Sequence, residues 1–83
     1  MNKSEILKKK ILYRSSYRGT KEMDILLSSF VKFYINKLTK LELKNLNNLL
    51  EKEDEVIYNF YYNRKTDVLK ENNITILLKK FKI

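Results

Sequence analysis

Residues 18–34 read Arg-Gly-Thr-Lys-Glu-Met-Asp-Ile-Leu-Leu-Ser-Ser-Phe-Val-Lys-Phe-Tyr, and this stretch carries the strongest helical signal in the chain. Its apolar residues recur at the three- and four-residue spacing that places side chains on one face of a helix. Thr20 can cap this helix, and Glu22 and Asp24 fall in its first turn, where the helix dipole favours acids. The pattern predicts a helix over residues 21–36 with one buried stripe, formed by Met23, Leu26, Leu27, Phe30, Val31 and Tyr34.

Four further helical segments flank this stretch, and several begin at a recognisable signal. Ser4 is expected to cap the first segment, and Thr39 with Glu42 three residues on forms a capping box before the third. Asp54 is a possible cap of the fourth segment. Together with the central stretch, the predicted helices cover about 4–17, 21–36, 40–50, 54–62 and 73–81, while residues 63–72 are expected to be partly irregular.

Gly19 is the only glycine in the chain and stands between the first two predicted helices. Because glycine adopts a left-handed backbone conformation without steric cost, we expect Gly19 to end the first helix in that conformation and to mark a sharp corner. The chain has 83 residues and no proline, whereas strand-rich domains need many turns built from glycine and proline. The sequence therefore predicts an all-α, small single-domain bundle of about five helices over residues 1–83.

The residue types that are missing exclude several classes of site. The chain contains no Cys and no His, which removes thiol and imidazole catalysis and the usual zinc ligands. No glycine-rich phosphate loop or dinucleotide fingerprint occurs, and Ser15 and Ser16 have no base at a recognisable spacing. We therefore expect no enzymatic activity, no metal site and no stably bound FAD. With no secretory signal at residues 1–10 and no apolar run of about 18 residues, we expect a cytoplasmic protein without membrane insertion.

The net charge of +8 leaves two interpretations open. The lysines at positions 8–10 precede Arg14 and Arg18, and Tyr13 and Tyr17 are interleaved with these cations, so the chain could be a small basic helical module that binds nucleic acid. Alternatively, the lysines are solvated surface residues of a lysine-rich proteome, which we favour because the acidic residues between Glu51 and Glu55 interrupt any continuous basic face.

The most informative motif is Lys-Ile-Leu-Tyr-Arg-Ser-Ser-Tyr-Arg-Gly-Thr-Lys-Glu-Met-Asp at residues 10–24. It resembles the SdhE-type FAD assembly factors, the succinate dehydrogenase assembly factor 2 family, whose hallmark Arg-Gly-x-x-Glu is matched by Arg18, Gly19 and Glu22. A second block continues the resemblance with Leu49-Leu50-Glu51, Asp54 and Ile57-Tyr58-Asn59-Phe60. On these motifs the chain is identified as a bacterial member of that family.

The resemblance implies a small bundle of five helices and a role in assembly. Members of this family bind the flavoprotein subunit of succinate dehydrogenase, and in some bacteria that of fumarate reductase, and promote covalent attachment of FAD to a histidine of that subunit. The bond is thought to form within the flavoprotein itself. We therefore expect a chaperone-like factor that is monomeric when free, whose partner is this flavoprotein subunit and not nucleic acid.

Seven residues around the corner are predicted to bind the partner. Arg18 and Glu22 could instead form an internal ion pair that fixes the corner, and Arg14 could be a solvated arginine near a helix end. Tyr13 and Tyr17 could be core residues or anchors of an interface. The resemblance favours the partner-binding interpretation for the whole set, which comprises Arg18, Gly19, Glu22, Arg14, Tyr13, Tyr17 and Ile25.

Overall fold

Five α-helices carry the fold of the chain, whose structure is a computed structural model that describes residues 2–83. No β-strand occurs between these residues, so the predicted all-α class is confirmed. One short 3₁₀ turn, η1, interrupts the segment between the last two helices. The elements in chain order are α1 (Lys3–Ser16), α2 (Lys21–Tyr34), α3 (Lys40–Leu50), α4 (Asp54–Tyr61), η1 (Thr66–Val68) and α5 (Asn73–Lys80).

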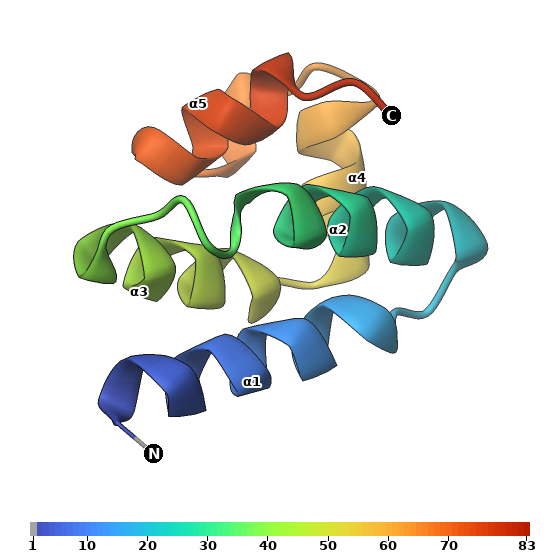
Figure 1. Cartoon of the computed structure of the whole chain (residues 1–83). Helices are drawn as coiled ribbons and strands as arrows, with labels where there is room; N and C mark the ends of the chain where they lie inside the picture. The colour runs from blue at the N-terminus through green and yellow to red at the C-terminus, as the bar shows by residue number, and fades with distance from the viewer. Residues whose placement is uncertain (1) are drawn as a thin grey trace.

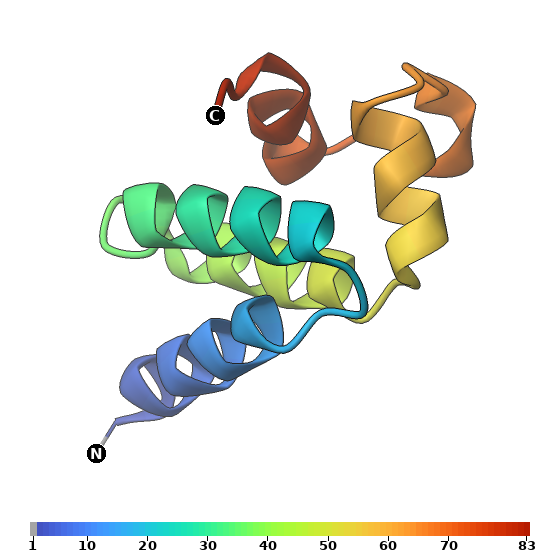
Figure 2. The same ribbon diagram turned by 90° about the vertical axis from the view of Figure 1, so that its right-hand side faces the viewer.

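The helices are arranged around α2 and α3, which run side by side through the middle of the molecule (Figure 1). Helix α1 packs against both of them from below, and α5 covers α3 from above. Helix α4 stands across the end of this stack and contacts η1 and α5, as the turned view in Figure 2 shows. The end of α1, the start of α2, the end of α3 and the start of α4 therefore meet at one corner. No helix between residues 2 and 83 is long and apolar enough to cross a membrane.

The helix ends differ from the predicted ranges by at most two residues, but two predicted caps are wrong. Asn2, not Ser4, caps α1, since its side-chain oxygen accepts from the backbone N–H of Glu5 over 2.8 Å. Asp54 is the first residue of α4 rather than its cap, and Glu53 at the cap position makes no capping hydrogen bond with its side chain. The predicted cap of α2 is present: the Thr20 hydroxyl accepts from the Met23 N–H.

The stripe predicted for α2 forms the centre of the core. Five of its six residues are buried, and Tyr34 is half-buried against Phe30. Helix α1 contributes mainly Ile11, which is fully buried. Burial of each such aliphatic or aromatic side chain stabilises the fold by about 1.5–3 kcal/mol. The buried residues of the stripe are Met23, Leu26, Leu27, Phe30 and Val31.

The carboxy-terminal segment is fastened by polar contacts rather than by a long helix. The Tyr61 hydroxyl donates to the Phe81 carbonyl, and the Arg64 guanidinium donates to the Lys79 carbonyl over 3.0 Å. Asn72 caps α5 in a capping box with Thr75. These contacts hold the segment 63–72 against α4 and α5, although only three of its residues form a 3₁₀ turn.

The capping box predicted for α3 is present. The Thr39 hydroxyl accepts from the Glu42 N–H over 3.2 Å, and the Thr39 N–H donates to the Glu42 carboxylate over 2.8 Å. The backbone donor of Thr39 is the main reason that the pKa of Glu42 lies below its ordinary value of 4.5.

This capping box predicts a pH-dependent contribution to stability. A carboxyl whose pKa is lower in the folded than in the unfolded state stabilises the fold above its unfolded pKa, and this stabilisation disappears as pH falls through the folded pKa. We expect wild type to be more stable than Glu42→Gln above about pH 5, with the difference vanishing towards about pH 3. Urea unfolding across this range measures it. Glu71→Gln is the control, since Glu71 is exposed and its carboxylate forms no hydrogen bond or ion pair with the other described residues; an equal effect of both variants would contradict the assignment.

Candidate functional site

A single side chain, Arg18, connects the four helix ends that meet at the corner. Its Nε donates to Asp54 Oδ1 over 2.7 Å, and its guanidinium nitrogens donate to the carbonyl oxygens of Arg14 at 3.2 Å, Leu50 at 2.9 Å and Lys52 at 3.0 Å. These acceptors belong to the ends of α1 and α3 and to the start of α4. Only 9% of the Arg18 side chain is exposed. We call this set of contacts, together with Gly19, the Arg18 junction.

Arg18 satisfies carbonyl groups that helix ends leave without partners. The last carbonyl oxygens of an α-helix receive no hydrogen bond from a backbone N–H of the same helix. The negative end of the helix dipole also favours a cation there. The guanidinium provides both the charge and donors in a fixed planar fork, which the flexible ammonium of lysine does not. The proposed ion pair between Arg18 and Glu22 is therefore wrong, since Arg18 pairs with Asp54 instead.

Asp54 completes the junction from the opposite side. Its second carboxylate oxygen, Oδ2, accepts the backbone N–H of Gly19 over 2.7 Å. One carboxylate thus binds the side chain of Arg18 and the backbone of the next residue, and 25% of it remains exposed. These two bonds fix the link between α1 and α2 relative to the start of α4.

The role of Gly19 differs from the predicted one. Helix α1 already ends at Ser16, and Gly19 does not adopt a positive φ angle. A Cβ atom on Gly19 would lie 3.1 Å from Asp54 Oδ2, closer than an ordinary van der Waals contact. Glycine therefore allows the carboxylate to approach closely without being displaced by a side chain, and no left-handed turn is involved.

Two serine hydroxyls add hydrogen bonds in the last turn of α1. Both Ser15 and Ser16 donate to the Leu12 carbonyl over 2.9 Å. Ser15 is buried, so its hydroxyl requires this acceptor. These bonds satisfy the polar groups of the last turn before the chain turns towards Gly19.

One side of the junction opens into a groove that contains four of the predicted residues. Arg14 pairs with Glu51 over 3.1 Å and so joins α1 to α3. Tyr13 and Tyr17 are 68% and 76% exposed, which excludes the core interpretation, and their rings lie 5.0 Å apart. We call this open space of about 430 Å³ the tyrosine groove; it is lined by Tyr13, Arg14, Tyr17, Arg18, Leu50 and Glu51.

The other side of the junction opens into a smaller space between α2 and α4. It measures about 230 Å³, and its walls are mainly apolar. Arg18 lines the tyrosine groove while Asp54 lines this second space, so the ion pair forms the ridge between them. We call this space the apolar hollow; it is lined by Thr20, Met23, Asp54, Glu55 and Tyr58.

Glu22 and Ile25 lie on α2, and neither lines the tyrosine groove or the apolar hollow. Both are exposed, Ile25 to 44%, and their spacing of three residues makes them neighbours on the helix surface. Burial raises the pKa of Tyr62, and the nearby Tyr61 hydroxyl and then the charge of Glu22 raise it further, which indicates that Glu22 lies near Tyr62, just after the end of α4. Four of the seven predicted residues therefore line the tyrosine groove, Gly19 belongs to the junction, and Glu22 and Ile25 form a separate exposed pair on α2.

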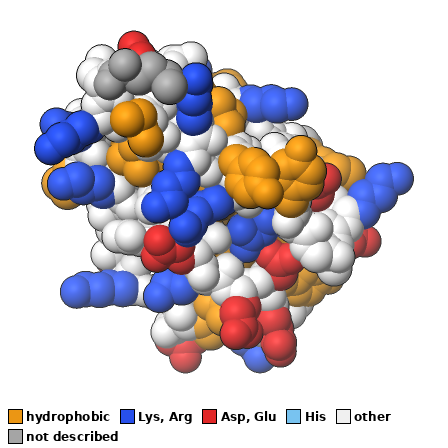
Figure 3. Space-filling model, turned by 90° about the horizontal axis from the view of Figure 1, so that it is seen from below, with side chains coloured by type: hydrophobic (Ala, Val, Ile, Leu, Met, Phe, Trp, Pro, Cys, Tyr) orange, Lys and Arg blue, Asp and Glu red, His pale blue; other side chains and the backbone are white. Residues whose placement is uncertain are grey.

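The exposed chemistry of the corner is that of a binding surface. Figure 3, which views the molecule from the α1 side, shows hydrophobic side chains exposed next to both basic and acidic ones. Within residues 2–83 no group of three or more acids could hold a metal ion. Exposed tyrosines next to charged groups are typical of protein–protein contacts.

Comparison with known proteins assigns the chain to a family. A family model described as "Flavinator of succinate dehydrogenase" matches residues 9–82, which is almost the whole chain. The chain belongs to this flavinator family. The family assignment made from the motif at residues 10–24 is thereby confirmed, and the match includes the Arg18 junction and both spaces beside it.

Curated relatives of two kinds resemble the chain. The mitochondrial succinate dehydrogenase assembly factor 2 of Dictyostelium discoideum is 41% identical over 73 residues, which are 88% of this chain and 51% of that protein. The mitochondrial factor of Yarrowia lipolytica is 36% identical over 67 residues, 81% of this chain and 45% of that protein. A bacterial relative, the FAD assembly factor SdhE of Acetobacter pasteurianus, is 30% identical over 73 residues, 88% of this chain and 65% of that protein.

The matched region is shorter than these flavinator-family relatives. The chain spans about half the length of the Dictyostelium discoideum protein and 65% of the Acetobacter pasteurianus protein. No solved structure matches the chain.

Sequence reasoning missed the partners of Arg18 in this flavinator-family corner. The sequence predicts Asp54 only as a possible helix cap and as part of the second motif block. Asp54 lies 36 positions from Arg18, so no local spacing links the two residues. Glu55 and Tyr58 were not predicted to share a surface with α2. The only available signal was the joint presence of both blocks, since carbonyl acceptors such as those of Leu50 and Lys52 leave no trace in side-chain identity.

The junction predicts a specific cost for Asp54→Asn. An asparagine has one acceptor oxygen where aspartate has two, so either Arg18 or the Gly19 N–H loses its partner. Because Arg18 is nearly buried, we expect a loss of about 2–3 kcal/mol in the free energy of unfolding, measured by urea denaturation. Glu55→Gln, one residue later and exposed, should cost less than about 0.5 kcal/mol. Equal costs for both variants would mean that the junction does not stabilise the fold.

Proposed function

We propose that the chain binds the flavoprotein subunit of succinate dehydrogenase and promotes covalent attachment of FAD to it, as an assembly factor and not as a catalyst. The observation that carries this proposal is the Arg18 junction, in which two residues of the Arg-Gly-x-x-Glu motif hold four helix ends together. Membership of the flavinator family and the names of the relatives support it.

The junction favours binding because it orders the surface before the partner arrives. Association loses free energy when flexible side chains and loops become fixed, so a surface held by internal bonds loses less. Here the link from Tyr17 to Thr20 is held by Asp54, and Tyr13 and Tyr17 project from the last turns of α1. A rigid factor of this kind stabilises one conformation of its client, in which the client itself forms the bond to FAD.

The predicted residues divide into two roles under this proposal. Arg18 and Gly19 are positioning residues, since the guanidinium donates inward and the Gly19 N–H is bound to Asp54. The exposed side chains contact the client, with the tyrosines as large anchors and the carboxylate as a charged contact. The proposed contact residues are Tyr13, Arg14, Tyr17, Glu22 and Ile25.

The proposal places FAD in the client and not in this chain. Both spaces at the corner are open, and neither is preceded by a glycine-rich loop at a strand end that would hold a pyrophosphate. We propose that no FAD is bound stably by the isolated chain and that the free chain is monomeric. The gathering of acids at the corner disfavours nucleic acid as the partner.

A bacterial source and a cytoplasmic location are also part of the proposal. The similarity to the Acetobacter pasteurianus factor is consistent with a bacterial source, whereas the relatives from Dictyostelium discoideum and Yarrowia lipolytica are mitochondrial. Fractionation of the native cells, followed by immunodetection of the chain, tests the location.

Covalent flavin in the client tests the function directly. Flavin fluorescence of the denatured succinate dehydrogenase flavoprotein, separated on a gel, reports only covalently attached FAD. Deletion of the gene for this chain should reduce this fluorescence severely, and expression of the wild-type chain should restore it. We expect Glu22→Ala to restore less than about a tenth of it, since a contact at the centre of an interface contributes 1–2 kcal/mol or more.

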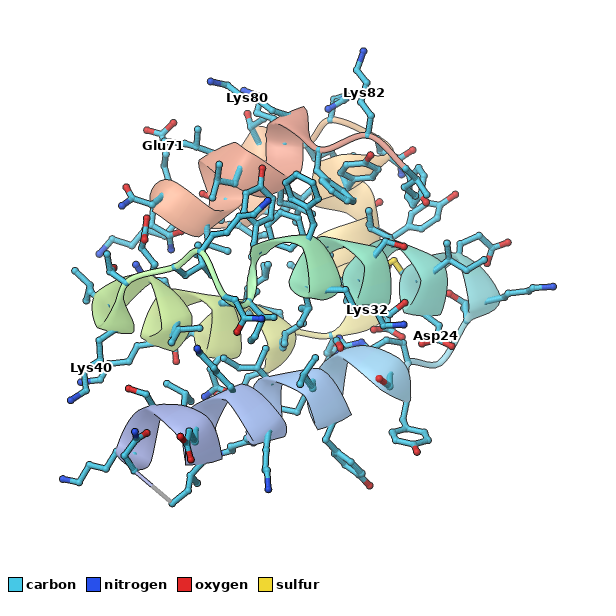
Figure 4. The ribbon with its side chains drawn as sticks, viewed as in Figure 1. Asp24, Lys32, Lys40, Glu71, Lys80 and Lys82 are labelled. Atoms are coloured by element: carbon cyan, nitrogen blue, oxygen red, sulfur yellow. The ribbon has the colours of Figure 1, made fainter. Side chains whose placement is uncertain are left out.

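Asp24→Ala is the matched control for Glu22→Ala. Both acids lie in the first turn of α2 and interact with the same helix dipole, so loss of that interaction is equal in both variants. The Asp24 side chain lies below α2, towards α1, in the view of Figure 4. Full flavinylation with Glu22→Ala would contradict the proposed site, and unchanged flavinylation without the chain would contradict the function.

A further inference from the structure

Acidic residues gather at the corner although the chain as a whole is basic. Six of its ten acids fall in two short segments, residues 22–24 and 51–55, which the fold brings together at the start of α2 and the start of α4. The chain nevertheless carries a net charge of +8. The local charge at the corner is therefore opposite in sign to that of the whole molecule.

Two of these acids are neutralised by arginine and the others are not. Glu51 pairs with Arg14, and Asp54 pairs with Arg18. In the part of the chain that the structure describes, neither Glu22 nor Glu55 forms an ion pair, and both are exposed. The lining of the apolar hollow thus includes one carboxylate, that of Glu55, that can attract a cation from outside, and Glu22 is exposed on the neighbouring helix α2.

The hollow itself is suited to an apolar group. Its volume of about 230 Å³ exceeds the roughly 30 Å³ that one water occupies in the liquid several times over, so it can take a whole side chain. Met23 lies at its α2 wall and is almost fully buried; its thioether adapts easily to the shape of a partner. Tyr58 forms the α4 wall, and its ring packs 4.8 Å from that of Tyr62.

We propose that the apolar hollow receives one apolar side chain of the flavoprotein client, flanked by a lysine or arginine that pairs with Glu55. The proposal rests on the proposed function and adds the chemistry of the client segment. Charge complementarity selects a cationic segment, and the apolar walls select a hydrophobic residue next to the cation. An anionic partner such as nucleic acid would meet repulsion at this site.

Two substitutions test the charge and the wall separately. Glu55→Lys reverses the charge at this position, and we expect it to raise the dissociation constant for the purified, FAD-free flavoprotein subunit about 5- to 30-fold. Tyr58→Ala removes the wall, with an expected weakening of at least about 5-fold, whereas Tyr58→Phe should bind as wild type does. Both positions are exposed, and circular dichroism of each variant shows whether the helices are intact.

Glu71→Lys is the matched control for Glu55→Lys. It makes the same change in net charge, but Glu71 lies at the far upper edge beside α5 (Figure 4). We expect its dissociation constant to stay within about twofold of wild type, because exposed charges separated by more than a Debye length are screened.

The possible outcomes separate this inference from the function on which it rests. Weaker binding by Glu55→Lys and Tyr58→Ala, but not by Glu71→Lys, supports the inference. If wild type binds the flavoprotein and promotes flavinylation while both corner variants bind equally well, the inference is wrong and the function stands. Equal weakening by both lysine variants would mean that net charge, not the hollow, governs binding, which also overturns it. Absence of binding by wild type would overturn both.

Discussion

The guanidinium of Arg18 is the contact on which the arrangement of the corner depends. It donates to Asp54 and to carbonyls from the ends of α1 and α3 and from the link before α4, and it is almost fully removed from solvent. Loss of the Asp54 carboxylate would leave a nearly buried cation without its counter-ion, which is why such pairs are costly to break. The hydrophobic stripe of α2 holds the bundle together, but it does not determine how the four helix ends meet; the junction does.

The same junction separates two surfaces with different chemistry. The tyrosine groove carries exposed aromatic rings beside the Arg14–Glu51 pair, whereas the apolar hollow has hydrophobic walls and a rim of carboxylates. The net charge of +8 therefore gives a poor description of the charge at this corner. A small domain has little interior for a deep site, and a ridge between two shallow spaces is what four converging helix ends can form.

The sequence predicts local structure well here because the signals are local. The stripe from Met23 to Val31 and the capping box of Thr39 depend on residues three or four positions apart, and both occur in the structure. The junction depends instead on Asp54, 36 positions from Arg18, and on backbone carbonyls that any residue provides. Gly19 illustrates the difference: its position at the corner was predictable, but its reason, the approach of a distant carboxylate, was not. The family resemblance pointed to this corner without revealing which of its residues face inward.

Amide hydrogen exchange at Gly19 tests the central claim most directly. Gly19 is an exposed residue in a link between helices, so its N–H would exchange rapidly unless the Asp54 carboxylate holds it. We predict exchange at least about 100-fold slower than in an unstructured peptide for wild type, and loss of most of this protection in Asp54→Ala, which removes both carboxylate oxygens. Exchange of the Gly19 amide at the unstructured rate in the folded wild-type protein would contradict the junction as the constraint that organises the site.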